Sequence, residues 1–171
     1  MVEPVQNQII KILPTAEELY NRLVLVVGES GYGKTAVLSD IAKEYDTQVI
    51  NLNLILSEQL LELTAKQRIL RLPKIISALI NEAGPLVILD NIEILFDEGL
   101  KQDPLKLLQG ISRNKTVVAS WNGKYDKNKL IYAEPDHPEY RTYDAEDVII
   151  IGMDGTLTID VEENIKEAGQ A

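Results

Sequence analysis

The sequence predicts one α/β domain with a central, mostly parallel five-stranded sheet flanked by helices. Two observations support this fold: short runs rich in Val, Ile and Leu alternate with amphipathic helical stretches, and a glycine-rich segment joins the first run to the helix after it. A chain of 171 residues has room for one such domain and its core, but not for two. We assign residues 1–152 to the domain and residues 153–171 to an acidic tail, in which "MDGT" can form a short hairpin.

Five apolar runs have the length and composition of buried strands. Each is too short for a long helix. The last of them is expected to add an edge to the sheet or to close it. The five runs are residues 22–28, 47–53, 85–91, 115–121 and 147–152.

Three segments between these runs have helical spacing. The first helix is expected directly after the glycines. Residues 57–84 predict two helices or one kinked helix, with Ser57 as the N-cap and Pro73 as the break. The third helix has Asp103 as its N-cap and Pro104 at its first position. The apolar face of the first helix consists of Val37, Leu38, Ile41 and Ala42.

Residues 122–144 are polar and contain two prolines, so they predict a long structured loop. The loop holds four tyrosines, which suit either a partner surface or packing within the loop. His137, the only histidine, has no cysteine or second histidine as a partner, so we interpret it as a loop residue rather than a metal ligand.

The composition is that of a folded protein, with 45% hydrophobic and 26% charged residues. The lack of cysteine excludes disulfides and thiolate metal sites. The first residues do not resemble a secretion signal, and no apolar run approaches the roughly 20 residues that span a bilayer. These features predict a cytoplasmic protein without membrane contact.

The net charge of −10 weighs against non-specific binding of nucleic acid. Residues 99–130 are an exception, because they carry seven basic and two acidic side chains. This basic island can face DNA, a nucleotide on a neighbouring subunit, or only solvent. Residues 131–171, with two basic and eleven acidic side chains, are a possible counterweight.

The glycine-rich segment fits the P-loop pattern G-x-x-x-x-G-K-[ST] through Gly28, Gly33, Lys34 and Thr35. Glycine lets the backbone wrap closely around a polyphosphate with its N–H groups pointing inward. Lys34 would contact the β- and γ-phosphates of ATP, and the Thr35 hydroxyl would bind Mg²⁺. The variable positions of the loop, also expected to line the nucleotide, are Glu29, Ser30, Gly31 and Tyr32.

Asp90 ends the apolar run "LVILD" and is expected to hold Mg²⁺ through water, opposite Thr35. Its alternative role is that of a cap for the following turn. Additional-strand ATPases normally carry a catalytic glutamate directly after this aspartate, and Asn91 stands there instead. Glu93 is a candidate substitute for this base, or a carboxylate that only favours the dipole of a helix.

Two further sites concern the γ-phosphate. Ser120 or Asn122, at the end of the fourth run, lies where a polar sensor of this phosphate would sit. Arg113, in the turn before that run, is either an arginine finger for the nucleotide of a neighbouring subunit or an ordinary surface residue. The arginine finger would require a homo-oligomer.

The sequence resembles the BrxF family, the small P-loop proteins of type III BREX phage-defence systems. The resemblance covers most of residues 20–143. It implies an AAA-type, additional-strand P-loop domain without a helical lid, which binds ATP through residues 28–35 and Mg²⁺ through Asp90. It also implies a bacterial cytoplasm and other BREX proteins as partners. The stretches that carry it are, in order, "GESGYGKT", "VILDNIE", "DPLKLLQGISRNKTVVASW" and "YAEPDHPEYRTY".

Three functions are compatible with these features. The first is an ATPase that assembles and acts as a motor or switch. The second is a nucleotide-gated scaffold that hydrolyses little ATP and binds DNA or another defence protein, which Asn91 and the basic island favour. The third is a small-molecule kinase, for which Arg68 and Arg71 would be the phosphate-binding arginines.

Overall fold

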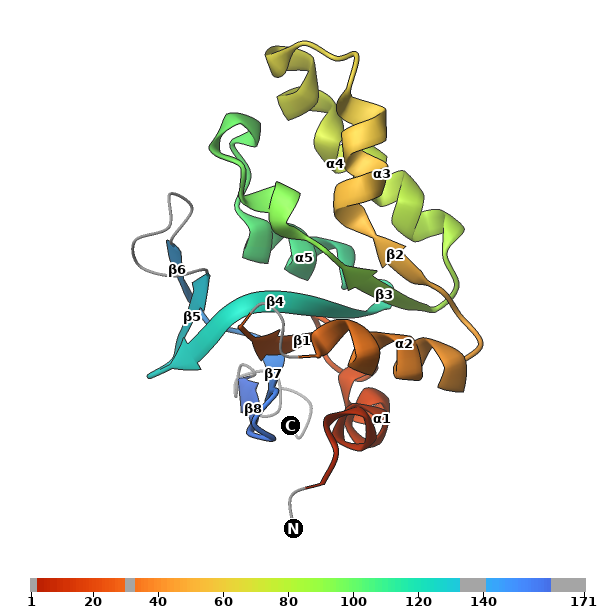
Figure 1. The fold of residues 1–171 in the computed structure, drawn as a ribbon, viewed down its shortest axis with the longest axis vertical. Coiled ribbons are helices and arrows are strands. Elements are labelled where there is room, and N and C mark those ends of the chain that lie inside the picture. Colours follow the sequence, from red (N-terminus) through yellow and green to blue (C-terminus); the bar gives the residue numbers. More distant parts are fainter. Residues whose placement is uncertain (1–2, 30–32, 133–140, 161–171) are drawn as a thin grey trace, which may run out of the picture.

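The structure is a computed structural model that describes residues 3–29, 33–132 and 141–160. Figure 1 shows one sheet with helices on both faces. The predicted nucleotide-binding residues Ser30, Gly31 and Tyr32, and the loop histidine His137, lie outside the described residues.

The five predicted parallel strands are present, in the order β2-β3-β4-β1-β7. The sheet therefore has an additional strand, β4, between the P-loop strand β1 and the strand β3 that carries Asp90. β7 is not an edge strand, because β8 pairs with it antiparallel across a turn at residues 153–156. The bounds are β1 (Leu23–Gly28), β2 (Val49–Asn51), β3 (Leu86–Asp90), β4 (Thr116–Asp126), β7 (Val148–Gly152) and β8 (Leu157–Asp160).

The prediction of a long loop over residues 122–144 is wrong for the described part of this segment, which forms strands. β4 continues to Asp126 and pairs antiparallel with β5 (Lys129–Tyr132), which pairs with β6 (Arg141–Asp144). The β4–β5 turn has only two residues, Lys127 and Asn128, both with positive φ (48° and 66°), as in a type I′ hairpin. This turn lacks the glycine that usually marks such hairpins, so the sequence pattern did not predict it.

Gly123 allows β4 to approach β5 closely at the start of this extension. A Cβ atom there would lie 1.8 Å from the carbonyl oxygen of Ile131. We call the end of β4 from Gly123, together with β5 and β6, the arm. It extends past the parallel strands on one side of the sheet (Figure 1).

Two apolar cores lie on the two faces of the sheet, because alternate residues of each strand point to opposite sides. In β1, Leu23, Leu25 and Val27 face one core and Val24 and Val26 face the other. Helices α3, α4 and α5 cover the first face, and α1 and α2 cover the second (Figure 1). The bounds are α1 (Val5–Ala16), α2 (Lys34–Glu44), α3 (Leu52–Leu60), α4 (Ala65–Glu82) and α5 (Pro104–Ile111), with 3₁₀ turns η1 (Glu93–Phe96) and η2 (Glu98–Leu100).

The helix predictions are partly confirmed. α2 begins where expected and buries its predicted apolar face, and Asp103 caps α5 by accepting from Lys106 N. Ser57 is not an N-cap, because α3 begins five residues earlier, where Asn51 caps it. Pro73 does not break α4. Burial of Leu72, Ile76 and Ile80 on both sides of the proline holds the helix together.

Helix α1 was not predicted. Its buried residues nevertheless recur with helical spacing, including Val5, Ile9, Ile12 and Ala16. No helix in the described part of the chain is long and apolar enough to cross a membrane.

Candidate functional site

The P-loop lies at the carboxyl edge of the sheet, between the end of β1 at Gly28 and the start of α2 at Lys34. Gly33 is the N-cap of α2 and has a left-handed conformation with φ 88°. A side chain is strained in this conformation, so glycine suits the position. The free N–H groups and the positive dipole end of α2 point toward the loop, as in anion-binding sites.

Lys34 is buried, with 6% of its surface exposed. Its ammonium group donates to the carbonyl oxygens of Gly28 (2.8 Å) and Glu29 (2.6 Å), within the loop itself. Burial lowers the pKa of Lys34, and the carboxylates of Asp90, Glu93 and Glu29 act in the opposite direction. A buried ammonium that donates to neutral carbonyls is suited to exchange them for phosphate oxygens.

Thr35 and Asp90, 55 residues apart in sequence, meet in space. The Thr35 hydroxyl donates to Asp90 Oδ2 at 2.7 Å, and the Ser120 hydroxyl donates to Asp90 Oδ1 at 2.7 Å. Asp90 is buried at the end of β3, directly after Leu89, which pairs with Ala119 in the middle of β4. A hydroxyl and a carboxylate side by side are the hard oxygen ligands that Mg²⁺ prefers, so these residues fit this ion.

Asn91 has a left-handed backbone, with φ 53°. Its N–H donates to Asp90 Oδ1 (2.9 Å), and its carbonyl accepts from the N–H of Asn53 (2.8 Å). Asparagine tolerates this conformation better than glutamate does. The residue after Asp90 thus holds the backbone turn that leads to Glu93.

Glu93 begins the 3₁₀ turn η1 and is held by two asparagines. Asn122 Nδ2 donates to Glu93 Oε1 at 2.5 Å, and Asn53 Nδ2 donates to Glu93 Oε2 at 3.2 Å. The negative charge of Glu93 acts on the P-loop lysine and favours a higher pKa for it. Asn53 was not predicted as a site residue. Its position at the end of the second predicted strand nevertheless places it at the carboxyl edge of the sheet, as for Asp90.

The structure does not bring Arg113 to this site. It is exposed at the amino end of β4, the opposite edge of the sheet, and its guanidinium lies 5.2 Å from the centre of the Tyr20 ring. In the kinase hypothesis, Arg68 was a phosphate ligand, but it donates to the carbonyls of Leu61 and Leu63 at the turn between α3 and α4.

The basic island is not one continuous face. Arg113 and Lys127 lie at opposite ends of β4, a separation of about 35 Å at 3.3 Å per residue. Lys115 donates to three carbonyls at the end of α4, and Lys129 pairs with Asp144. The island therefore splits between the two edges of the sheet.

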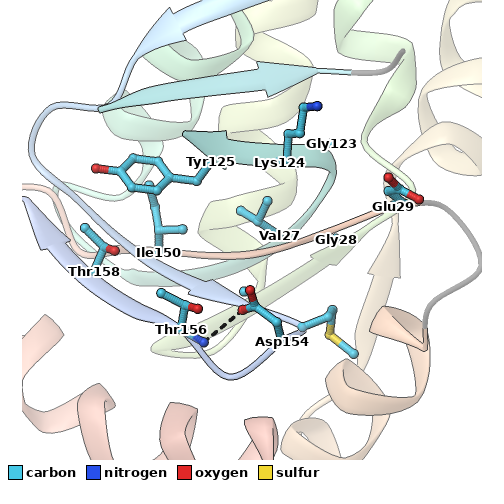
Figure 2. A pocket seen from close by; sticks show the side chains of 12 residues that line it. Val27, Gly28, Glu29, Gly123, Lys124, Tyr125, Ile150, Asp154, Thr156 and Thr158 are labelled. Carbon is cyan, nitrogen blue, oxygen red and sulfur yellow. Dashed lines mark hydrogen bonds between the residues drawn. The ribbon is translucent and has the colours of Figure 1, made fainter. Parts of the chain in front are cut away.

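A pocket of about 400 Å³ opens beside the first two residues of the P-loop. Figure 2 shows Val27 and Ile150 as its floor, between Tyr125 on β4 and Thr158 on β8. Met153 also lines the pocket and packs close to Gly28, the first residue of the P-loop. Other lining residues are Glu29, Gly123, Lys124, Gly152, Asp154 and Thr156.

Comparison with known proteins gives one family match. The model of the ATPase family associated with various cellular activities (AAA) matches residues 24–129, more than half of the chain. The chain is similar to the solved structure of C. elegans PCH-2, with 21% sequence identity and a TM-score of 0.41. That alignment covers 72% of this chain and 36% of the PCH-2 chain, so this sequence spans little more than a third of that protein. No curated protein matches the chain.

Proposed function

Because the chain belongs to the AAA family of ATPases, we propose that it binds ATP with Mg²⁺ in the P-loop and hydrolyses it. The observation that carries the proposal is the meeting of Lys34, Thr35 and Asp90 at one edge of the sheet. A lysine, a hydroxyl and a carboxylate, the groups that recognise a metal-bound polyphosphate, lie together at the N-terminus of α2.

In the nucleotide complex, Lys34 exchanges the carbonyls of Gly28 and Glu29 for phosphate oxygens. Thr35 and Asp90 would hold Mg²⁺, which when bound would supply positive charge to the β- and γ-phosphates. Ser120 keeps the Asp90 carboxylate oriented through its hydrogen bond. The remaining P-loop residues contribute backbone N–H groups to the phosphates.

Hydrolysis requires a base, and we assign this role to Glu93. The carboxylate accepts a proton from a water molecule whose oxygen forms a bond to the γ-phosphorus, while the bond from that phosphorus to the ADP oxygen breaks. Asn122 orients Glu93 and senses the γ-phosphate. Asn91 has no carboxylate to act as the base; its backbone N–H donates to Asp90 and helps to orient that side chain.

The resemblance to the BrxF family extends the proposal to phage defence in a bacterial cytoplasm, together with other BREX proteins. We further propose a homo-oligomer in which Arg113 of one subunit reaches the nucleotide of the next. Because Arg113 lies at the edge opposite its own P-loop, any nucleotide that it contacts belongs to another subunit; the alternative is an ordinary surface residue. Contact with DNA would use the exposed lysines of the basic island, Lys101, Lys106, Lys124 and Lys127.

A second candidate is a nucleotide-gated scaffold with slow hydrolysis. One observation favours it: both oxygens of Glu93 accept hydrogen bonds from asparagine amides. These bonds compete with a hydrogen bond from the attacking water. In this case ATP would stabilise a surface for a partner, and phosphate release would be slow.

The test is phosphate release from ATP over a range of protein concentrations, with and without duplex DNA. The wild type is compared with Arg113→Ala and Glu93→Gln. Turnover that rises cooperatively with concentration and is lost in both variants supports the assembled ATPase. Tight ATP binding with no turnover at any concentration contradicts it and supports the scaffold.

A further inference from the structure

Four aromatic rings pack together next to the Glu93 site. Phe96 stacks on Tyr132, with ring centroids 3.5 Å apart and planes 3° from parallel. Trp121 meets Phe96 and Tyr143 edge to face, with centroid distances of 5.2 and 5.5 Å. Three of the four residues (Phe96, Trp121 and Tyr132) are nearly fully buried, so the rings form a rigid unit.

Two of these rings are close in sequence to Glu93 and Asn122, the two partners of the Asn122–Glu93 hydrogen bond. Phe96 ends the single 3₁₀ turn that Glu93 begins, and Trp121 directly precedes Asn122. The Asn122–Glu93 hydrogen bond therefore joins two segments that are each anchored in the ring cluster. A shift of either ring moves one partner of this bond.

The other two rings belong to the arm. Tyr132 is the last residue of β5 and Tyr143 lies in β6. The Trp121 indole N–H also donates to the carbonyl of Ile131 in β5, at 3.2 Å. The arm thus holds both Phe96 and Trp121 in place.

We infer that Tyr132 and Tyr143 are positioning residues, which set the Glu93–Asn122 contact through Phe96 and Trp121. The inference rests on the proposed function, because it assumes that Glu93 is the base. Neither tyrosine belongs to the P-loop or to the Thr35–Asp90 pair. Their removal should therefore impair the chemical step and leave ATP binding intact, since misplacement of a catalytic group by about 1 Å can cost roughly a hundredfold in rate.

The experiment measures kcat and KM for ATP hydrolysis in Tyr132→Leu, which keeps an apolar side chain but removes the ring. We expect kcat to fall about ten- to a hundredfold while KM stays within about twofold. Tyr132→Phe, which restores the ring, should recover most of kcat. The matched control is Tyr125→Leu, because Tyr125 is in the same arm but outside the ring cluster, and its hydroxyl donates to Asn128.

Trp121 is the only tryptophan, so its emission during urea unfolding shows whether each variant is folded. Tyr143→Leu is a second test at a half-buried ring if Tyr132→Leu does not fold. A folded Tyr132→Leu or Tyr143→Leu protein with wild-type kcat, alongside inactive Glu93→Gln, overturns the inference but not the proposed ATPase. A wild-type chain that binds ATP without turnover overturns both.

Discussion

Asn53 holds both the side chain of Glu93 and the backbone beside it. Its Nδ2 donates to Glu93 Oε2 at 3.2 Å, while its Oδ1 accepts from the N–H of Ile94 at 2.7 Å. Asn53 lies in the first turn of α3, directly after β2. One asparagine therefore connects the end of the second strand to the turn that carries the proposed base.

We predict that Asn53→Ala changes hydrolysis as well as stability. Loss of the acceptor leaves the half-buried Ile94 N–H unsatisfied, which should lower the free energy of unfolding by about 1–3 kcal/mol. Glu93 also loses one of its two amide donors, so kcat should change several-fold. The control is Asn51→Ala, because Asn51 caps the same helix without touching Glu93. Urea unfolding and phosphate release measure the two effects, and equal kcat values in both variants would contradict the assigned role.

Lys34→Ala should abolish ATP binding without unfolding the protein. The hydrogen bonds of its ammonium go to P-loop carbonyls, and burial of this charge is unfavourable, so its removal should leave the fold intact. Isothermal titration with ATP measures the affinity, and circular dichroism the fold. Lys43→Ala, an exposed lysine of the same helix, serves as the control. Unchanged ATP affinity in Lys34→Ala would refute the P-loop assignment.

The lowered pKa of Lys34 predicts a specific dependence on pH. In the unfolded chain its pKa returns to the ordinary value of 10.5, so between the two pKa values the unfolded state binds more protons. The Lys34 contribution to the free energy of unfolding therefore increases with pH in this window. ATP affinity should decrease there, because phosphate binds the charged form. Urea unfolding of wild type and Lys34→Met from neutral pH to about pH 10 isolates the trend in stability, and titration of the wild type with ATP over the same range measures the trend in affinity.

The sequence predicted the parallel sheet well, because runs of Val, Ile and Leu define buried strands. The spacing from Gly28 to Thr35 predicts the P-loop, of which residues 30–32 lie outside the described residues. The polar segment after β4 was misjudged for a physical reason. Its strands form through antiparallel pairing and aromatic packing between Tyr132, Tyr143 and Phe96, and polar composition alone conceals such contacts.

The site was predictable only in part. Thr35 and Asp90 follow from the motif and from the rule that carboxyl ends of parallel strands share an edge. Asn53 follows from the same rule but carries no motif of its own. The contact between Glu93 and Asn122 depends on the left-handed turn at Asn91, a backbone feature that composition does not reveal.

Asp90→Asn should remove the Mg²⁺ dependence of nucleotide binding. The carboxylate is the only charged group in contact with the Thr35 hydroxyl among the described residues, and an amide cannot replace its charge. ATP affinity is measured over a Mg²⁺ titration. Ser120→Ala is the matched control: it removes one hydrogen bond to Asp90 but keeps the carboxylate, so Mg²⁺ dependence should persist with less than about a tenfold loss of affinity. Retained Mg²⁺ dependence in Asp90→Asn would place the ion elsewhere.

Gly28→Ala should destabilise the domain through Met153. A Cβ at position 28 would lie 2.7 Å from Cγ and 3.2 Å from Cβ of Met153, which packs against the loop from the turn after β7. Such overpacking costs about 1–3 kcal/mol. The double variant Gly28→Ala with Met153→Ala should recover most of this loss, because the nearer atom is gone. Gly84→Ala, with open space around its Cβ, should change stability by less than about 0.5 kcal/mol. Urea unfolding of wild type, Gly28→Ala, Met153→Ala and the double variant gives the coupling energy, and strictly additive effects of the two substitutions would show that Met153 does not restrict the P-loop.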